Sequence, residues 1–336
     1  MNYELLKTPY KSTNYELFES LVQQLYPENS PRHTFGFDPI TTYLLDCYVL
    51  KKDEEIVGRF ALYNNPNLYY QGKHAATIGS YECVDDKEIA SELLTHAKRI
   101  AKQEGFEYLI GPMEGSTWNN YRFTDDSSED VFFMEPYHQA YYPEHFIQFG
   151  FDKIGSYFSN IAHPISYDSD SLDKMEIAFQ EAGMQLRTIN LENLAVELEK
   201  IADFCNAAFE DNFLFTPIPK KDFVAKYIRF KKYFDPDFIF ISEDATGKMN
   251  GLFFPIKDYC DETGKRFVLK TMARLKDAPF RGMVEYLGQK TIKKAIEKGF
   301  TTSIHAFILN DNVSVEMSKR FSGKPYKSHS LYGMEL

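Results

Sequence analysis

The residues best suited to chemistry in this sequence gather in one short segment of the first half. Polar and aromatic side chains follow one another between Glu114 and Arg122, directly after an expected strand at Tyr108–Ile110. Loops that leave this end of a strand are where open α/β sheets bind their ligands. An arginine such as Arg122 can hold a carboxylate or a phosphate through two parallel hydrogen bonds. We therefore predict a substrate-binding set that consists of Glu114, Thr117, Trp118, Asn120, Tyr121, Arg122 and Glu135.

A purely structural interpretation of the same segment stays open. In that interpretation Trp118, the single tryptophan of the chain, is buried where two domains meet. Arg122 then pairs with Glu135 instead of a ligand. Both interpretations account for the residue types.

Motifs for other chemistries are absent from the sequence. It contains no G-x-S-x-G, Walker loop, H-E-x-x-H or C-x-x-C pattern. His138 and His145 have no third ligand at metal spacing, so we expect no metal. The scattered cysteines and the lack of a secretory leader after Met1 predict the reduced cytoplasm. Apolar runs are shorter than the about 20 residues that cross a bilayer, so we expect no membrane span.

Charge is distributed unevenly along the 336 residues. The net charge is −11; residues 1–181 carry 14 Lys+Arg against 29 Asp+Glu (−15), and residues 182–336 carry 24 against 20 (+4). Nucleic-acid binding depends largely on neutralised phosphates, so the acidic first half predicts no nucleic acid partner. The second half can hold a polyanionic small molecule.

Hydrophobic periodicity predicts the elements that position these residues. In the first half we expect a hairpin of Leu45–Leu50 and Ile56–Tyr63, a strand at Ala75–Val84, a helix at Asp86–Gln103 and the strand Tyr108–Ile110. This order places the polar segment after a strand that follows a long helix.

The second half repeats the same order. It has a hairpin of Phe238–Ser242 and Gly251–Lys257, a strand at Arg266–Leu275, a helix at Val284–Lys298 and a strand at Thr301–Leu309. A repeat at about half the chain length indicates two similar α/β (α+β) domains. We expect them at residues 1–165 and 184–336, with a linker region at 166–183.

The order of elements, with a long helix that starts directly from the fourth strand, resembles the GNAT (GCN5-related N-acetyltransferase) fold, in tandem over nearly the whole chain. In the first half, Ile110–Met113, Thr117–Trp118 and Glu135–Pro136 are similar to uncharacterised bacterial GNAT-like proteins. In the second half, Phe280–Gly282 and Asn312 resemble the cofactor loop and the asparagine-led last helix of the family. The resemblance implies two acyl-CoA N-acyltransferase domains, each a mixed, mostly antiparallel sheet flanked by helices.

The resemblance also implies where a coenzyme would bind. In GNAT enzymes the loop after the fourth strand reads Q/R-x-x-G-x-G/A, and its N–H groups and the helix start hold the pyrophosphate of coenzyme A. The first half has Asp85, Asp86 and Glu88 there, where an aspartate that caps the helix is the alternative to a phosphate site. The second half retains an arginine and a glycine, although a solvated arginine is the alternative. The implied cofactor-binding residues are Lys276, Phe280, Arg281, Gly282, Met283 and Asn312.

Acyl transfer to an amine needs a base for the amine proton and a donor for the leaving thiolate. Members of the family often place that donor on a tyrosine of the last helix, but the corresponding helix here has none. Tyr326 and Tyr332, on the tail, are candidates for the acid if the tail folds back, and Glu285, His305 and Glu316 are candidates for the base. The alternative is that Tyr332 and His305 have structural roles.

The resemblance favours a cytoplasmic enzyme that transfers acetyl from acetyl-CoA to a small-molecule or peptide amine held between the halves. Two alternatives stay open. One is a non-catalytic GNAT-fold protein that binds a ligand or regulates. The other is an aminoacyltransferase of the Fem type, which uses aminoacyl-tRNA and is disfavoured by the acidic first half. The sequence does not predict an oligomeric state.

Overall fold

The structure, a computed structural model, describes residues 2–34, 40–126, 128–310 and 314–336. The chain folds into two compact units. Unit 1 consists of residues 1–157, 214–216 and 327–336, and unit 2 of residues 158–213 and 217–326. These bounds differ from the expected ones, because the tail belongs to unit 1 and the expected linker contains helix α5 (Ser169–Glu181).

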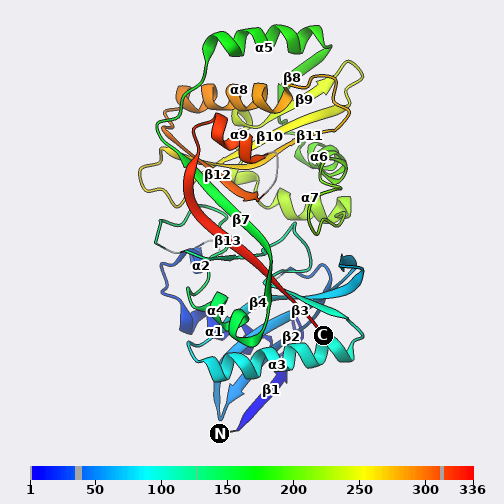
Figure 1. The fold of residues 1–336 in the computed structure, drawn as a ribbon, viewed down its shortest axis with the longest axis vertical. Helices are drawn as coiled ribbons and strands as arrows, with labels where there is room; N and C mark the ends of the chain where they lie inside the picture. Colours follow the sequence, from blue (N-terminus) through cyan, green and yellow to red (C-terminus); the bar gives the residue numbers. More distant parts are fainter. Residues whose placement is uncertain (1, 35–39, 127, 311–313) are drawn as a thin grey trace. The chain divides into compact units, whose positions relative to one another are not determined.

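Unit 1 is built on a mixed sheet with the strand order β1-β2-β3-β4-β5-β13 (Figure 1). The parallel pair is β4 with β5, and the other neighbours are antiparallel. The strands are β1 (Tyr3–Lys7), β2 (Leu44–Lys52), β3 (Glu55–Tyr70), β4 (Lys73–Cys83), β5 (Tyr108–Gly111) and β13 (Lys324–Glu335), and the short β6 (Phe123–Thr124) also pairs with β13.

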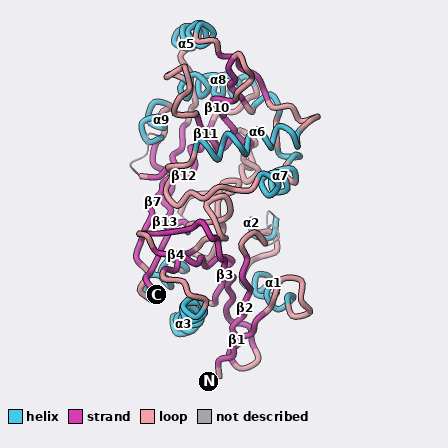
Figure 2. The backbone as a smooth tube through the Cα atoms, turned by 90° about the vertical axis from the view of Figure 1, so that its right-hand side faces the viewer, coloured by secondary structure: helices cyan, strands magenta, loops and turns pink. Residues whose placement is uncertain are grey.

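Helices cover the two faces of this sheet because successive strand residues point to opposite sides. Helix α3 (Lys87–Gln103) packs its apolar stripe in one core with Phe60 and Leu62 of β3. Helix α1 (Tyr15–Leu25) packs in a second core with Ala61 and Tyr63, the alternate residues of the same strand. Figure 2 shows α1 and α3 on the two sides of β2 and β3. The remaining helices of the unit are the short α2 (Pro31–Thr34) and α4 (Tyr142–Phe149).

Unit 2 repeats this plan. Its strand order is β8-β9-β10-β11-β12, followed by residues 158–162 of β7. Strands β11 and β12 are the parallel pair, and the pairs from β8 to β11 are antiparallel. The strands are β7 (Asp152–Ala162), β8 (Met184–Thr188), β9 (Phe240–Asp244), β10 (Met249–Lys257), β11 (Arg266–Arg274) and β12 (Thr302–Leu309).

Helix α8 (Met283–Glu297) connects the parallel strands of unit 2 and packs on β10 and β11. Gly288 lets the Phe321 ring approach this helix, since a Cβ atom at Gly288 would lie 2.3 Å from the ring. Helix α5 lies beside α8 (Figures 1 and 2). The other helices are α6 (Leu194–Ala208), α7 (Lys220–Ile228) and α9 (Ser314–Arg320), with 3-10 turns at Lys231–Tyr233 and Pro236–Phe238.

The predicted fold class is confirmed: each unit is an α/β structure with a mixed, mostly antiparallel sheet and flanking helices. The long helices predicted at Asp86–Gln103 and Val284–Lys298 are α3, which begins one residue later and ends as predicted, and α8, which begins and ends one residue earlier. Strand β3 extends to Tyr70, beyond the predicted end at Tyr63, because the polar residues after Tyr63 interrupt the alternation that predicts strands.

Candidate functional site

The parallel strands of unit 2 separate at the end that leads into α8. Their register runs from Arg266↔Thr302 to Leu269↔His305, and β11 then continues to Arg274. Past the paired region β11 is mostly half-buried, with Ala273 buried. Backbone N–H and C=O groups on this edge need partners, so it can bind a molecule that carries amides.

The start of α8 lies directly after this strand and the loop that follows it. Gly282, the residue before the helix, has no side chain that could cap α8, and the N–H group of Met283 donates to the carbonyl of Phe280 at 3.2 Å. Unpaired N–H groups at a helix start carry partial positive charge and bind anions. Arg281 is exposed beside them. The acidic residue of the first turn, Glu285, is held by Arg320 at 2.5 Å.

The other predicted cofactor residues have different surroundings. Met283 is fully buried, and Phe280 packs on the ring of Phe179 at 5.7 Å between centroids. Lys276 is exposed and forms ion pairs with Glu210 and Asp211. Asn312 lies outside the described residues. The loop thus brings Arg281 and the free helix start together, whereas Met283 and Phe280 anchor it.

His305 is a buried and fully hydrogen-bonded histidine. Its Nδ1 lies 2.8 Å from Ser318 Oγ and its Nε2 lies 3.1 Å from Ser303 Oγ. Burial lowers its pKa to about 4, so the ring is neutral at pH 7. Because both ring nitrogens already have hydrogen-bond partners, this geometry fits a structural role for His305 and not that of a base.

Tyr332 lies in unit 1 and not in the unit of Glu285 and His305. Its ring packs near Phe123 and Phe146, and its hydroxyl lies 3.5 Å from Asp125 Oδ1. Burial raises its pKa to about 12. The three predicted catalytic side chains therefore do not form a single cluster within either unit.

Helix α3 in unit 1 starts differently from α8. The carboxylate of Asp86 accepts hydrogen bonds from the N–H groups of Glu88 (2.9 Å) and Ile89 (3.1 Å). Asp86 therefore caps the start of α3, as one of the two sequence interpretations expected. A bound phosphate would have to displace a carboxylate that already occupies the helix start.

The predicted substrate loop of unit 1 folds back onto β4. The N–H of Met113 donates to the carbonyl of Ile78 at 2.8 Å, and Ser80 Oγ donates to Glu114 at 3.0 Å. Trp118 Nε1 donates to the carbonyl of Thr216 at 2.8 Å. Thr117 is half-buried and Asn120 is exposed.

Arg122 and Glu135 have separate partners. The Arg122 guanidinium lies between the rings of Tyr121 (3.7 Å) and Tyr157 (4.4 Å) and is buried. Glu135 forms a buried ion pair with Lys327 at 2.9 Å and accepts a hydrogen bond from Thr124. The structural interpretation of this segment expected Arg122 to pair with Glu135. In the structure, Glu135 pairs with Lys327 instead.

Sequence reasoning missed a buried cluster around Glu82. Its carboxylate accepts hydrogen bonds from Tyr26 (2.6 Å), Tyr142 (2.8 Å) and Arg32 (2.7 Å), and Arg59 lies 3.5 Å away. Burial lowers the pKa of Arg59 and raises that of Tyr26. In the sequence, the cluster is marked only by a charged residue within each of two apolar strands, Arg59 in β3 and Glu82 in β4. Because four donors already surround the carboxylate, we interpret this cluster as structural.

The described residues contain no group of three His, Cys, Asp or Glu side chains that could hold a metal ion. Every helix in this part of the chain is too short or too polar to cross a bilayer.

Known proteins that resemble this chain support the assignment of its fold. No family model matches the chain. Protein YghO of Escherichia coli is 21% identical over 281 residues, which are 75% of this chain and 72% of that protein. A solved tandem GNAT protein from the clavulanic acid biosynthesis pathway is 13% identical, with a TM-score of 0.55, over 99% of this chain and 98% of its own.

A second solved structure holds a GCN5-related glucosamine N-acetyltransferase region within a fungal multi-domain β-N-acetylglucosaminidase. It is 11% identical, with a TM-score of 0.59, over 99% of this chain, which spans 38% of the fungal protein. These likenesses show that the chain has the GNAT fold in tandem, and they confirm the resemblance inferred from the sequence.

Proposed function

We propose that the protein is an acyl-CoA-dependent N-acyltransferase that binds its coenzyme in unit 2. The observation that supports this most is the start of α8, where a helix start without a side-chain cap and the exposed Arg281 follow a strand that has separated from its neighbour β12. Together these features offer donors for a pyrophosphate and backbone partners for an amide-containing chain. In GNAT enzymes the loop at this point of the fold holds coenzyme A, which supports the proposal.

The reaction would join the acyl group to an amine. Acyl-CoA supplies a thioester; the amine nitrogen attacks its carbonyl carbon, a C–N bond forms, the C–S bond breaks, and the thiolate and the amine proton leave. The helix start and Arg281 would fix the phosphates, and the edge of β11 would align the pantetheine. His305 is unsuited to remove the proton because its two nitrogens are engaged in the core. The acceptor is an amine of a small molecule or a peptide, with acetyl as the first acyl group to test.

Calorimetric titration with acetyl-CoA and coenzyme A tests the site. We expect Arg281→Glu to weaken binding by at least about tenfold, since it replaces a favourable charge with a repulsive one near phosphates. Lys87→Glu makes the same charge change at the exposed start of α3 and serves as the matched control. Equal affinities for wild type and Arg281→Glu would contradict the assignment.

A second candidate is a non-catalytic protein that binds acyl-CoA or another ligand. One observation favours it: α9 contains no tyrosine, and His305 is fixed in the core. Thiol release from acetyl-CoA with a panel of amines separates the two candidates. Turnover that exceeds hydrolysis supports the enzyme, and binding without turnover on any amine supports the second candidate.

A further inference from the structure

Lys270 is the first residue of β11 beyond the part that pairs with β12. The last pair of the two strands joins Leu269 to His305. On the side of β10 the pairing skips Lys270, which makes it the extra residue of a β-bulge. Bulges change the direction of a side chain and are common next to active sites. Lys270 therefore stands where the two parallel strands separate, in a backbone that sets the direction of its side chain.

The Lys270 side chain points to α7. Its Nζ donates a hydrogen bond to the hydroxyl of Tyr227 at 3.2 Å, and it lies 4.9 Å from the centroid of the Tyr227 ring and 5.8 Å from that of Phe254. Burial raises the pKa of the Cys205 thiol of α6 to about 12, and the charge of Lys270 acts against this rise. The ammonium thus lies among side chains of β10, α6 and α7, in an aromatic environment that stabilises a cation.

This lysine lacks an acidic partner. It is half-buried, and in the part of the chain that the structure describes it forms no ion pair with an Asp or Glu. A charge that is partly removed from water is costly unless an opposite charge accompanies it. Tyr227 uses one of the three N–H groups of the ammonium. The other two N–H groups and the O–H of Tyr227 can therefore donate to an anion.

The segment that carries Tyr227 is strongly basic. Residues 220–232, which include α7, carry six Lys+Arg and one Asp in a chain with a net charge of −11. Within this segment Lys226 is half-buried, with its Nζ 5.9 Å from the centroid of the Tyr227 ring. A surface with one sign of charge attracts ligands of the opposite sign and raises their local concentration. The charge around Tyr227 thus favours an anionic ligand.

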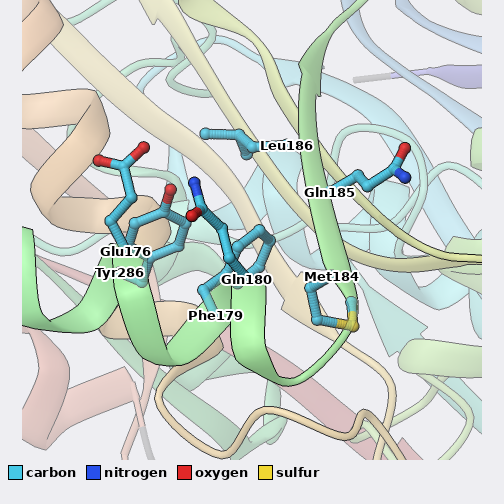
Figure 3. A pocket seen from close by; sticks show the side chains of 7 residues that line it. All are labelled: Glu176, Phe179, Gln180, Met184, Gln185, Leu186 and Tyr286. Atoms are coloured by element: carbon cyan, nitrogen blue, oxygen red, sulfur yellow. The ribbon is translucent and has the colours of Figure 1, made fainter.

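A pocket elsewhere in unit 2 lacks such an available charge. It has a volume of about 380 Å³ and lies between α5, β8 and α8 (Figure 3). The charged side chain that lines it, Glu176, is already held by Lys290 at 3.1 Å. The rings of Phe179 and Tyr286 are each only 1% exposed, so they present little surface to a ligand. The contrast favours the surroundings of Lys270 as a binding site.

We propose that the amine acceptor also carries an acid group, and that Lys270 and Tyr227 are the specificity-determining residues that bind it. The inference rests on the proposed function, because a pantetheine that follows β11 back from the start of α8 ends where β11 meets β12, next to Lys270. The amine would attack the acyl group there while the ammonium and the tyrosine hydroxyl hold the acid group. A carboxylate and a phosphate both suit these donors, and the experiment distinguishes them.

The test measures thiol release from acetyl-CoA by the full chain with matched pairs of acceptors. One set pairs each standard amino acid with its α-amide, which keeps the amine and removes the charge of the carboxylate. A second set pairs O-phosphoethanolamine with ethanolamine. The readout is the ratio of kcat/KM between the charged and the neutral member of each pair, so a general loss of activity or of folded protein cancels.

Three variants alter the proposed site. Lys270→Gln removes the charge and keeps most of the side chain, Lys270→Arg keeps the charge, and Tyr227→Phe removes one hydroxyl. Lys257→Gln is the matched control, because Lys257 also lies over a tyrosine ring, that of Tyr259 at 5.9 Å, but at the exposed last residue of β10.

We expect wild type and Lys257→Gln to prefer the charged member of at least one pair by at least about tenfold, the effect of one partly desolvated ion pair. Lys270→Gln lowers this ratio to near one, and Lys270→Arg retains most of it. Tyr227→Phe lowers the ratio by about three- to tenfold, the effect of one hydrogen bond. A preference for amino acids over their amides identifies a carboxylate, and one for O-phosphoethanolamine identifies a phosphate.

Turnover at equal kcat/KM for both members of every pair, or a preference that Lys270→Gln leaves unchanged, would overturn this inference while the proposed function stands. If wild type turns over none of the acceptors, saturation-transfer NMR measures binding of the same probes without coenzyme. Binding of the charged members that Lys270→Gln abolishes would support the acid-binding site and favour the non-catalytic candidate. No binding of any charged member would overturn the inference, and the coenzyme titration above decides the proposed function separately.

Discussion

Two helices hold the same place in the two units but begin in opposite ways. Helix α3 connects the parallel strands β4 and β5, and α8 connects β11 and β12. At the start of α3 the Asp86 carboxylate occupies two N–H groups. At the start of α8 stands Gly282, with Arg281 exposed next to it. One helix start is closed to anions by its own sequence, and the other is open to them.

The strands that lead into these helices also differ, in how deeply their unpaired ends are buried. Past its pairing with β5, β4 is largely buried, and Met113 hydrogen-bonds the Ile78 carbonyl. Past its pairing with β12, β11 stays mostly half-buried. A shared fold thus supports one unit with a filled core and one with an accessible edge. The difference supports the proposal that the coenzyme binds in unit 2, and the predictions below test it.

The largest expected effect comes from the filled core of unit 1. Glu82→Gln removes the charge that compensates Arg59 and Arg32, with Glu82 and Arg59 almost fully buried. Breaking a buried pair in this way costs about 3–5 kcal/mol of unfolding free energy. Denaturant unfolding measures it. Glu285→Gln in the half-exposed pair with Arg320 is the control, expected at about 0.5 kcal/mol. A loss for Glu82→Gln no larger than the control would show that the cluster is unimportant.

The buried His305 should make the free energy of unfolding depend on pH. Its pKa is about 4 in the folded protein, below its ordinary value of 6.5. The unfolded chain therefore binds the proton more readily, and stability falls as pH decreases from about 6.5 to about 4, by about 3 kcal/mol for this residue. We expect His305→Asn to flatten the unfolding free energy over this pH range. An unchanged slope in the variant would contradict the assigned burial effect.

A smaller effect is expected from the cap of α3. Asp86→Ala removes the acceptor of two N–H groups and lowers the unfolding free energy by about 1 kcal/mol. Coenzyme affinity should stay as in wild type, because the helix start of unit 1 is not the proposed site. A gain in coenzyme affinity above that of wild type would mean that unit 1 retains a coenzyme site which Asp86 blocks.

Local pattern predicted much of this structure. The apolar stripes of α3 and α8 recur every three to four residues, so both helices could be located to within a residue. The position of Asp86 directly before a helix likewise predicts its capping role. These features depend on neighbours along the chain.

Features that depend on distant residues could not be predicted in the same way. The hydrogen-bond partners of Glu82, namely Tyr26, Arg32 and Tyr142, lie 50 to 60 residues away in sequence, and no spacing rule relates them. Likewise, residues 214–216 and 327–336 join unit 1, although the first segment interrupts unit 2 in the chain and the second follows it. Helix α5 likewise lies in the segment expected as a linker region followed by a short helix, and its packing beside α8 depends on residues far along the chain.

Amide hydrogen exchange with and without coenzyme A is the most direct test of whether unit 2 binds the coenzyme. We predict slower exchange in peptides that cover β11 and the start of α8, residues 266–290. Peptides that cover β4 and the start of α3, residues 73–92, should not change. Slower exchange at residues 73–92 with none at 266–290 would contradict the claim.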